Sequence, residues 1–280
     1  IPKFDFQPKP HFDLGVNLGV IDFERGVKIA GPRFYFLKGA LVRMRRAMTE
    51  MFESHLEEQG FVPIAPPLLV KEKTLYGTGY LPFAQKANFK IEGADLTLIG
   101  TSEQPLITQH MDEIMDADQL PLKYVGESEC FRTEAGSHGR DTRGLMRVHQ
   151  FYKTEQIVFC RPEDSEEWHQ RTLANEEWIL KELGIPYQVV LTAVQDLAPF
   201  GSIKYDLEAW IPSQCKYREM TSNTNLLDYQ TRRSNIRADD RKQKRKFFPH
   251  TISATGFPDR LMIAIMENYQ REDGSIDIPD

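Results

Sequence analysis

The clearest hydrophobic pattern in the chain lies between residues 39 and 60. Apolar side chains recur there at three- and four-residue steps, at Leu41, Met44, Met48, Met51, Phe52 and Leu56. This spacing places them on one face of a long helix, which Gly60 can end. A strand over residues 61–64 should follow, and Pro66 and Pro67 should stop it because proline has no N–H group for a sheet ladder.

Patterns further along the chain predict more helices and strands. A second helix should run from Asp164, a possible cap, to Gly184. Strands are predicted over residues 187–192 and 204–211, and residues 261–269 are apolar nearly all round, which is typical of a buried helix. Because strands outnumber the helices that could connect parallel strands, we expect an α+β fold in which a mostly antiparallel sheet carries helices on one side.

The composition is that of a globular protein. Of 280 residues, 40% are hydrophobic and 27% charged, which is enough apolar surface for a core. Every apolar run is far shorter than the roughly 20 residues of a membrane-spanning helix, so we expect no membrane partner. No internal repeat or flexible linker divides the chain, which favours one domain over residues 1–280.

The cysteines and the N-terminus indicate the compartment. Cys130, Cys160 and Cys215 are far apart and odd in number, which argues against a disulfide framework and a cysteine zinc site. The first residues show no targeting peptide, although the chain does not begin with Met. We expect a reducing compartment, namely the cytoplasm, with an organellar matrix as the alternative.

The charge distribution leaves one candidate surface for nucleic acid. A formal net charge of -6 gives the chain no overall attraction to a polyanion. The segment 232–246 is locally basic, with eight Lys and Arg residues against Asp239 and Asp240. It is either a local nucleic-acid contact or a solvated loop between two strands.

The most informative stretch, residues 124–159, reads as a long β-hairpin around a mobile polar loop at 135–144. Because strand side chains alternate, one strand would present Cys130, Arg132 and Glu134 on one face. The other strand would present His149, Phe151, Lys153 and Glu155 together. Charged groups are costly on a buried face, so this surface either contacts a polar ligand or is an open solvated face with Phe151 at its edge.

The chain resembles the catalytic domain of the seryl-tRNA synthetases, which are class II aminoacyl-tRNA synthetases. Residues 130–137, 139–145 and 147–151 are similar to motif 2 of that family. Further similar segments lie at residues 23–25, 77–79, 101–103, 205–210, 217–219 and 267–270. The resemblance runs from about His11 to Asp280.

The resemblance implies a six- to seven-stranded antiparallel sheet flanked by helices. It also implies that residues 1–280 form one catalytic domain, with motif 1 at about 39–67, motif 2 at about 124–159 and motif 3 at about 253–270. The N-terminal tRNA-binding arm of the family is absent from this chain, so the expected contact with tRNA is at its acceptor end.

Seven residues are assigned to ATP and its metal by the resemblance, namely Arg132, Glu134, Arg147, Phe151, Glu219, Ser222 and Arg260. Arg132 would contact the α-phosphate and the substrate carboxylate, and Arg147 and Arg260 the γ-phosphate. Glu134 would contact the adenine amino group, and Phe151 would stack on the adenine. Glu219 and Ser222 would hold Mg²⁺. Arg132 and Arg260 are the residues expected to act in catalysis.

The resemblance also implies a serine site formed by Thr101, Glu103, Arg132, Glu155, Ser253 and Thr255. Thr101, Glu103 and Glu155 would surround the amino group and the hydroxyl of serine. Two departures from the family concern this site. Ser253 replaces an Asn and the motif 3 loop is one residue shorter, while residues 222–225 read Ser-Asn-Thr-Asn where the family has Ser-Cys-Ser-Asn. They put serine selectivity in more doubt than ATP binding.

These roles agree with the chemistry of amino-acid activation. A carboxylate attacks the α-phosphorus of ATP, and negative charge develops on the phosphate oxygens and on pyrophosphate. Planar arginine donors and a metal ion stabilise such charge without a protein nucleophile. The ammonium group of the substrate in turn requires carboxylates, which Glu103 and Glu155 can provide.

We therefore expect a serine–tRNA ligase that uses ATP and Mg²⁺. Two alternatives remain. The chain could be a paralogue that activates an amino acid for an acceptor other than tRNA, or a non-catalytic dimeric homologue. A homodimer is expected through motif 1, because the apolar stripe of residues 41–56 is more surface than one domain need bury internally.

Overall fold

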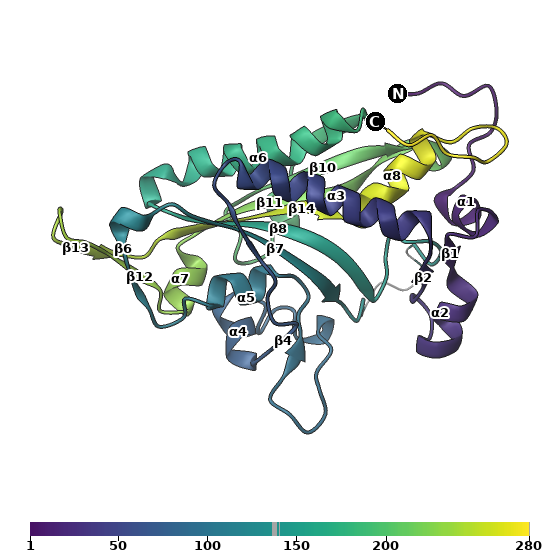
Figure 1. Ribbon diagram of the computed structural model, residues 1–280. Helices are drawn as coiled ribbons and strands as arrows, with labels where there is room; N and C mark the ends of the chain where they lie inside the picture. Colours follow the sequence, from purple (N-terminus) through teal and green to yellow (C-terminus); the bar gives the residue numbers. More distant parts are fainter. Residues whose placement is uncertain (136–138, 140, 280) are drawn as a thin grey trace.

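A seven-stranded sheet forms the centre of the molecule (Figure 1). The computed structural model describes residues 1–135, 139 and 141–279. The strands of the sheet follow the order β3 (Val62–Ile64), β7 (Leu122–Phe131), β8 (Gln150–Cys160), β14 (His250–Pro258), β11 (Lys216–Leu227), β10 (Ile203–Ile211) and β9 (Tyr187–Leu191). All neighbours are antiparallel except the edge pair β3 and β7. This confirms the predicted α+β fold.

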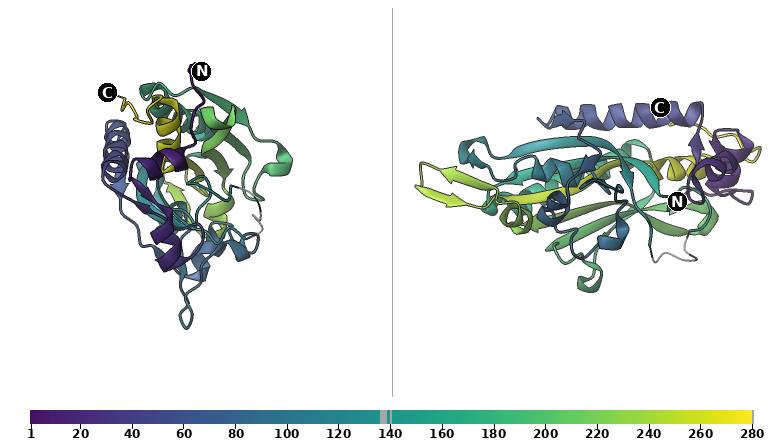
Figure 2. Two further views of the ribbon diagram at one scale, coloured as in Figure 1. Left: turned by 90° about the vertical axis from the view of Figure 1, so that its right-hand side faces the viewer. Right: turned by 90° about the horizontal axis from the view of Figure 1, so that it is seen from below.

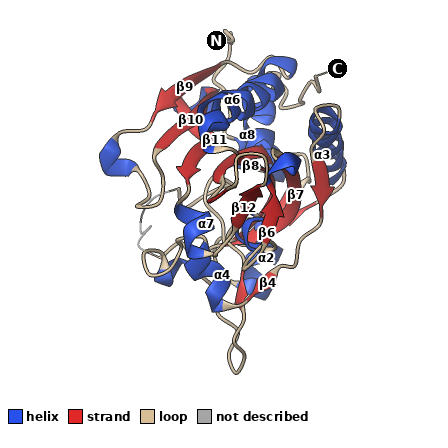
Figure 3. Cartoon of the chain, turned by 90° about the vertical axis from the view of Figure 1, so that its left-hand side faces the viewer, coloured by secondary structure: helices blue, strands red, loops and turns tan. Residues whose placement is uncertain are grey.

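Helices cover both faces of this sheet. The long helices α3 (Ala40–Glu57) and α6 (Ser165–Glu182) and the buried α8 (Arg260–Asn268) lie on one face, and the short helices α4 (Glu72–Gly77), α5 (Glu103–Thr108) and α7 (Tyr229–Arg233) lie on the other (Figures 1 and 3). The expectation of helices on one side is therefore wrong. The side chains of β8 alternate between two cores. Val158 and Cys160 pack in the core of the long helices, whereas Ile157 and Phe159 pack in the core that includes α5.

Smaller elements occupy the two ends of the molecule. At one end lie α1 (His11–Asn17), β1 (Ile21–Asp22), α2 (Phe23–Ala30) and β2 (Phe36–Leu37). At the opposite end a hairpin of β12 (Arg237–Asp240) and β13 (Arg245–Phe247) protrudes and pairs with β6 (Ile114–Asp116) (Figure 2). A further pair, β4 (Leu69–Val70) and β5 (Thr97–Leu98), lies beside α4 and α5.

The helix over residues 39–60 is confirmed as α3, but its apolar stripe is covered within the same chain. Leu41, Met48, Phe52 and Leu56 are buried in the main core, and Met44 and Met51 pack against it. The argument that this stripe needs a second subunit is therefore wrong. Helical spacing shows which face of a helix is apolar, and it leaves open what covers that face.

The predicted second helix and hairpin are confirmed with altered ends. A single 3₁₀ turn precedes α6, and the Asp164 side chain makes no capping hydrogen bond. The hairpin of β7 and β8 pairs Leu122 with Phe159 and Phe131 with Gln150. Arg132 and Glu134 therefore lie beyond the end of β7, and His149 lies before the start of β8. The expectations that Arg132 and Glu134 share a strand face with Cys130, and that His149 shares one with Phe151, are wrong. Residues 136–138 and 140 of the polar loop lie outside the described residues.

Among the residues that the structure describes, no helix combines the length and the apolar character needed to cross a membrane.

Candidate active site

Two adjoining cavities open beside β8, β14 and β11. The first, of about 240 Å³, contains Glu134, Arg147, Phe151, Thr255 and Arg260 in its walls. The second, of about 380 Å³, contains Glu103, Glu155 and Ser253. Four residues line both cavities, namely Arg132, Lys153, Glu219 and Ser222. Eleven of the twelve predicted site residues thus line one cavity or both, and the twelfth, Thr101, is buried behind Glu155.

Arg132 lies at the junction of the two cavities. Its Nε atom donates a hydrogen bond to the carbonyl of Gly100 at 3.2 Å, and its guanidinium lies 5.2 Å from the centre of the Phe151 ring. The backbone of Arg132 is fixed as well, because its N–H group donates to His149 O and His149 Nδ1 lies 2.9 Å from Arg132 O. The guanidinium is therefore held in place before any ligand binds.

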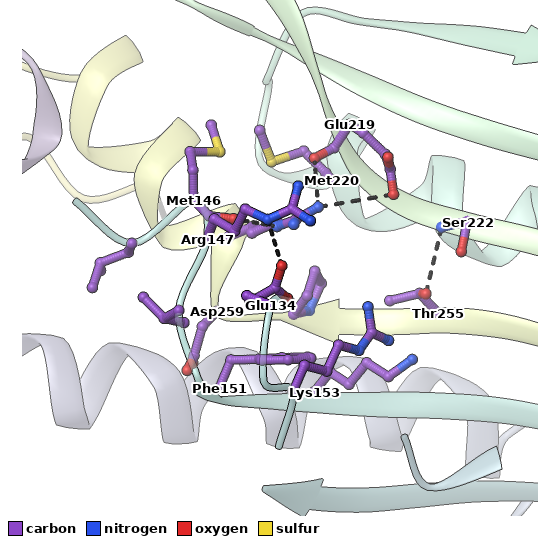
Figure 4. Close-up of a pocket in the computed structure, with 15 residues that line it drawn as sticks. Glu134, Met146, Arg147, Phe151, Lys153, Glu219, Met220, Ser222, Thr255 and Asp259 are labelled. Atoms are coloured by element: carbon purple, nitrogen blue, oxygen red, sulfur yellow. Dashed lines mark hydrogen bonds and ion pairs between the residues drawn. The ribbon is translucent and has the colours of Figure 1, made fainter. Parts of the chain in front are cut away.

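The upper wall of the first cavity holds an ion pair between Glu134 and Arg147. Figure 4 shows these two side chains pointing toward one another, with Phe151 and Lys153 on the strand opposite. Glu134 has a φ of 52°, in the left-handed region. Glu134 and Arg147 were assigned to adenine and to the γ-phosphate, so a nucleotide that contacts both must loosen or share their ion pair.

Arg260 begins α8 and closes the far side of the first cavity. Its Nε atom donates to Met146 O at 3.1 Å and its Nη1 atom to Glu219 O at 3.3 Å. The Glu219 carboxylate lies 3.8 Å from the same Nη1 atom. Three arginines, Arg132, Arg147 and Arg260, thus face one cavity, which is suited to a polyanionic ligand.

Glu219 and Ser222 lie together on β11 and line both cavities. Among the described residues, no group of three or more His, Cys, Asp and Glu side chains could hold a metal ion. One carboxylate and one hydroxyl nevertheless fit Mg²⁺, which keeps several waters and is bound by one or two protein carboxylates together with substrate phosphates. The oxygen donors of this pair therefore suit Mg²⁺ that arrives with ATP.

Glu155 is the centre of the second cavity. It is buried and forms an ion pair with Lys153. Ser253 Oγ donates to Glu155 Oε1 at 2.8 Å, and Thr101 Oγ1 donates to Glu155 Oε2 at 3.5 Å. Thr255 lies on the same strand as Ser253 and accepts from Ser222 N at 3.4 Å. Two of the three hydroxyl side chains predicted to contact serine thus bond one carboxylate, and the third, Thr255, lines the first cavity.

Glu103 is the second buried carboxyl of this cavity. Tyr80 Oη donates to it at 3.0 Å and Gln230 Nε2 at 2.6 Å. Burial, together with the charge of Glu155, raises the pKa of Glu103, and the charge of Lys153 lowers it. Two carboxyl groups in a buried pocket oppose each other's ionisation, and a bound cation relieves this. The second cavity is therefore suited to a small ligand with an ammonium group.

The residue assignments missed Lys153, Tyr80 and Gln230. Lys153 could have been found, because it alternates with Phe151 and Glu155 on one strand face and carries a charge. No local sequence pattern indicates Tyr80 or Gln230, since they contact Glu103 from 23 and 127 residues away in the sequence.

The basic segment 232–246 forms parts of α7, β12 and β13 at the end of the molecule (Figure 1). Three of its eight cations pair with acidic side chains, Arg232 with Asp228, Lys242 with Asp118 and Arg245 with Glu163. These pairs favour the interpretation as a solvated surface.

Comparison with known proteins identifies the family of the chain. Residues 88–269 match the model of the tRNA synthetase class II core domain (G, H, P, S and T). The chain is 46% identical over 280 residues to a serine–tRNA ligase of Clostridium botulinum, covering 99% of this chain and 66% of that protein. It is 47% identical over 283 residues to a serine–tRNA ligase of Acholeplasma laidlawii, covering 100% of this chain and 67% of that protein.

A solved structure is similar throughout the chain. The seryl-tRNA synthetase of Pyrococcus horikoshii, complexed with ATP, superposes with a TM-score of 0.96 at 44% identity. The match covers 99% of this chain and 62% of that one. This chain thus spans about two-thirds of the length of the proteins it resembles.

Proposed function

The chain belongs to the class II tRNA synthetases and, among them, to the seryl-tRNA synthetases, and from this membership we propose that it activates serine with ATP and transfers the seryl group to the 3′ end of tRNA. The observation that carries the proposal is the meeting of two cavities at Arg132, because activation needs the α-phosphate of ATP beside the carboxylate of the amino acid. The first cavity has the arginines for a triphosphate, and the second has the carboxylates for an ammonium group.

In the activation step, the serine carboxylate attacks the α-phosphorus and pyrophosphate leaves. Arg132, which lines both cavities, would bind the carboxylate and the α-phosphate and stabilise the charge that develops between them. Phe151 would stack on the adenine and Glu134 would accept from its amino group. Arg147 and Arg260 would bind the departing pyrophosphate end. Since the reacting groups are already a nucleophile and an electrophile, these residues act by position and charge.

Glu219 and Ser222 would hold Mg²⁺. When bound, this ion supplies further neutralisation of the phosphate charge. The contact of Arg260 with the backbone and the carboxylate of Glu219 supports a metal site next to the proposed pyrophosphate site. Arg260 and Glu219 would therefore adjust together when ATP and Mg²⁺ bind.

Serine recognition would use the buried carboxyl groups. Glu103 and Glu155 would take the ammonium group, and Lys153 would stay beside Glu155 and keep the carboxyl pair ionised. Thr101, Ser253 and Thr255 would provide the hydrogen-bonding partners for the serine hydroxyl. A site that bonds a substrate hydroxyl rejects an analogue without it, because its buried partners are then left unpaired.

We propose tRNA as the acceptor, bound through its acceptor end, and a homodimer as the assembly. Support for the dimer now comes from β3, which forms one edge of the large sheet and exposes Val62, and from the neighbouring exposed Leu68 and Leu69. The activity would belong in a reducing compartment, the cytoplasm or an organellar matrix, because Cys130, Cys160 and Cys215 are free thiols.

Pyrophosphate exchange with each of the amino acids tests the first step. We expect exchange with serine above all others, and no exchange with any amino acid would contradict the proposal. Charging of tRNA by the full-length protein tests the second step. Exchange with serine but no charging of any tRNA would indicate another acceptor.

A further inference from the structure

Asp259 directly precedes Arg260 and links it to the strand that carries Phe151. Its backbone N–H group donates to Tyr152 O at 3.0 Å, and its carboxylate Oδ2 accepts from Tyr152 N at 2.9 Å. Two hydrogen bonds therefore join the residue before Arg260 to the residue after Phe151. Arg260 and Phe151 are two of the side chains that line the first cavity.

The Asp259 carboxylate extends the pairing of β14 with β8 past Pro258. The ladder between β14 and β8 changes register between Thr255 and Pro258, which lies opposite Lys153. The Asp259 side chain accepts from the backbone N–H group of Tyr152, and it thereby continues the pairing of the two strands by one residue.

Two further side chains contact the same carboxylate. Tyr35 Oη donates to Oδ2 at 3.3 Å, and Arg45 Nη1 of α3 lies 3.7 Å from it. Arg45 also bonds Glu129 at 3.4 Å and lies over the Tyr152 ring. In Figure 4 the Asp259 side chain points away from the Glu134–Arg147 pair and toward α3.

Asp259 is ionisable and almost completely buried, at 3% exposure. Burial raises its pKa to about 6, the charge of Glu129 acts in the same direction, and the Tyr152 N–H group, Arg45 and Tyr35 oppose the rise. Its Oδ1 atom has no hydrogen-bond partner among the residues that the structure describes. An acidic side chain held at such a cost is expected to have a specific task.

We propose that Asp259 is a positioning residue for ATP, which fixes the spacing between Phe151 on β8 and Arg260 at the start of α8. Phe151 would stack on the adenine and Arg260 would contact the phosphates at a fixed distance from each other. No binding energy would then be spent on ordering these two side chains. This inference rests on the proposed function, because it takes ATP to be the ligand of the first cavity.

Variants of Asp259 separate this role from a purely structural one. Asp259→Asn keeps a side-chain oxygen that can accept from Tyr152 N, whereas Asp259→Ala removes it. In serine-dependent pyrophosphate exchange, we expect Asp259→Ala to raise the KM for ATP by about tenfold or more. The KM for serine should change by less than about twofold, because the contacts of Glu155 with Ser253 and Thr101 do not involve Asp259. Asp259→Asn should restore most of the ATP affinity.

A matched control is Asp240, which is equally buried and also accepts from a backbone N–H group, of Gln243, and from an arginine, Arg161. Asp240→Ala should lower the melting temperature and leave the KM for ATP unchanged. Should Asp259→Ala not fold, Asp259→Ser provides the same test, since serine suits the start of a helix and is too short to reach Tyr152 N.

The proposal is overturned if Asp259→Ala has the KM of the wild type for ATP, if both KM values rise equally, or if Asp259→Asn is no better than Asp259→Ala. Calorimetric titration with ATP alone distinguishes this failure from failure of the proposed function. A wild-type protein that binds ATP but exchanges pyrophosphate with no amino acid contradicts the function, and weaker ATP binding by Asp259→Ala would still support the positioning role.

Discussion

Lys153 and Glu155 lie two residues apart on β8 and form an ion pair where the two cavities meet. Both side chains are buried. The pair places a protein cation beside a carboxylate that, in the proposed function, also contacts the ammonium group of serine. In the proposed function Lys153 stays beside Glu155 when serine binds, and three of the five predictions below concern residues of these two cavities.

Replacement of Lys153 by Met should raise the KM for serine in pyrophosphate exchange by about tenfold, because a buried carboxyl pair that loses its counter-cation favours protonation. The charge of Lys153 lowers the pKa of Glu103, so its loss raises that pKa further, and a protonated Glu103 cannot attract an ammonium group. The defect should shrink as the pH is raised from 6.5 to 8.5. A defect that is the same at every pH would contradict this explanation.

Replacement of Arg132 by Ala should reduce kcat/KM for exchange by roughly 10²-fold or more, as removal of one preorganised donor to a transition state does. Arg132→Lys should not rescue the loss, because a lysine lacks the bidentate fork. Arg161→Ala, which breaks a distant ion pair with Asp240, is the matched control. Near-normal exchange by either Arg132 variant would contradict the role assigned to Arg132.

Ser253→Asn should increase the discrimination between serine and alanine. Ser253 Oγ donates to Glu155, and the longer Asn side chain adds an amide donor for the substrate hydroxyl. Loss of one partner from a hydroxyl-binding site erodes selectivity that can reach about 10⁴ to 10⁵. The measurement is the ratio of kcat/KM for serine and alanine in exchange. An unchanged or lower ratio would show that the shorter side chain does not limit selectivity.

Glu53→Gln should stabilise the protein at neutral and alkaline pH. Burial, with Glu127, Glu50 and Glu57 nearby, raises the pKa of Glu53 from 4.5 to about 7. The folded state then binds a proton that the unfolded state has lost, so the free energy of unfolding falls as the pH rises through this window. The gain should be about 1 kcal/mol at pH 8, after allowance for partial exposure of the side chain, and vanish near pH 4.5.

Thermal unfolding of the wild type and Glu53→Gln at pH 4.5 and pH 8 measures this difference. Glu92→Gln, at an exposed position, serves as the control. A stabilisation that is equal at both pH values would show that the carboxyl group of Glu53 is not its source.

The proposed homodimer predicts twice the mass of the chain by light scattering at micromolar concentration. Val62→Glu should shift the protein toward the monomer, because Val62 is exposed on the edge strand β3 and a buried unpaired charge is costly. Val189→Glu, on the opposite edge strand β9, should leave the mass unchanged. A wild-type monomer would exclude the dimer.

Much of the fold follows from local patterns. The periodicity of residues 41–56 and the alternation on either side of the polar loop predict α3 and the β7–β8 hairpin, because the spacing of side chains is fixed by the local backbone. The same patterns cannot show that the α3 stripe faces its own chain. They also cannot show that β7 ends at Phe131, since that end depends on contacts with Ile99 and His149 from elsewhere in the sequence.

The candidate site was predicted chiefly through the family resemblance. Motif positions supplied Arg132, Phe151, Glu155 and Arg260, which the structure brings to two adjoining cavities. The sequence alone could not indicate Gln230, because its contact with Glu103 joins residues 127 positions apart. Asp259 was also overlooked, since an aspartate before an arginine at a helix start reads as an ordinary surface cap, whereas its burial arises from β8 and α3.

The order of strands has a consequence for synthesis of the protein on the ribosome. β8 pairs with β14, the central strand of the sheet, which is almost 100 residues further along the chain. Pairing of such distant segments is slow and comes late in folding. A nascent chain that has emerged only as far as Phe151 and Glu155 lacks Ser253 and Arg260, so neither cavity can close. The site can therefore form only when almost the whole chain has been made, and a prematurely ended chain would have no partial activity.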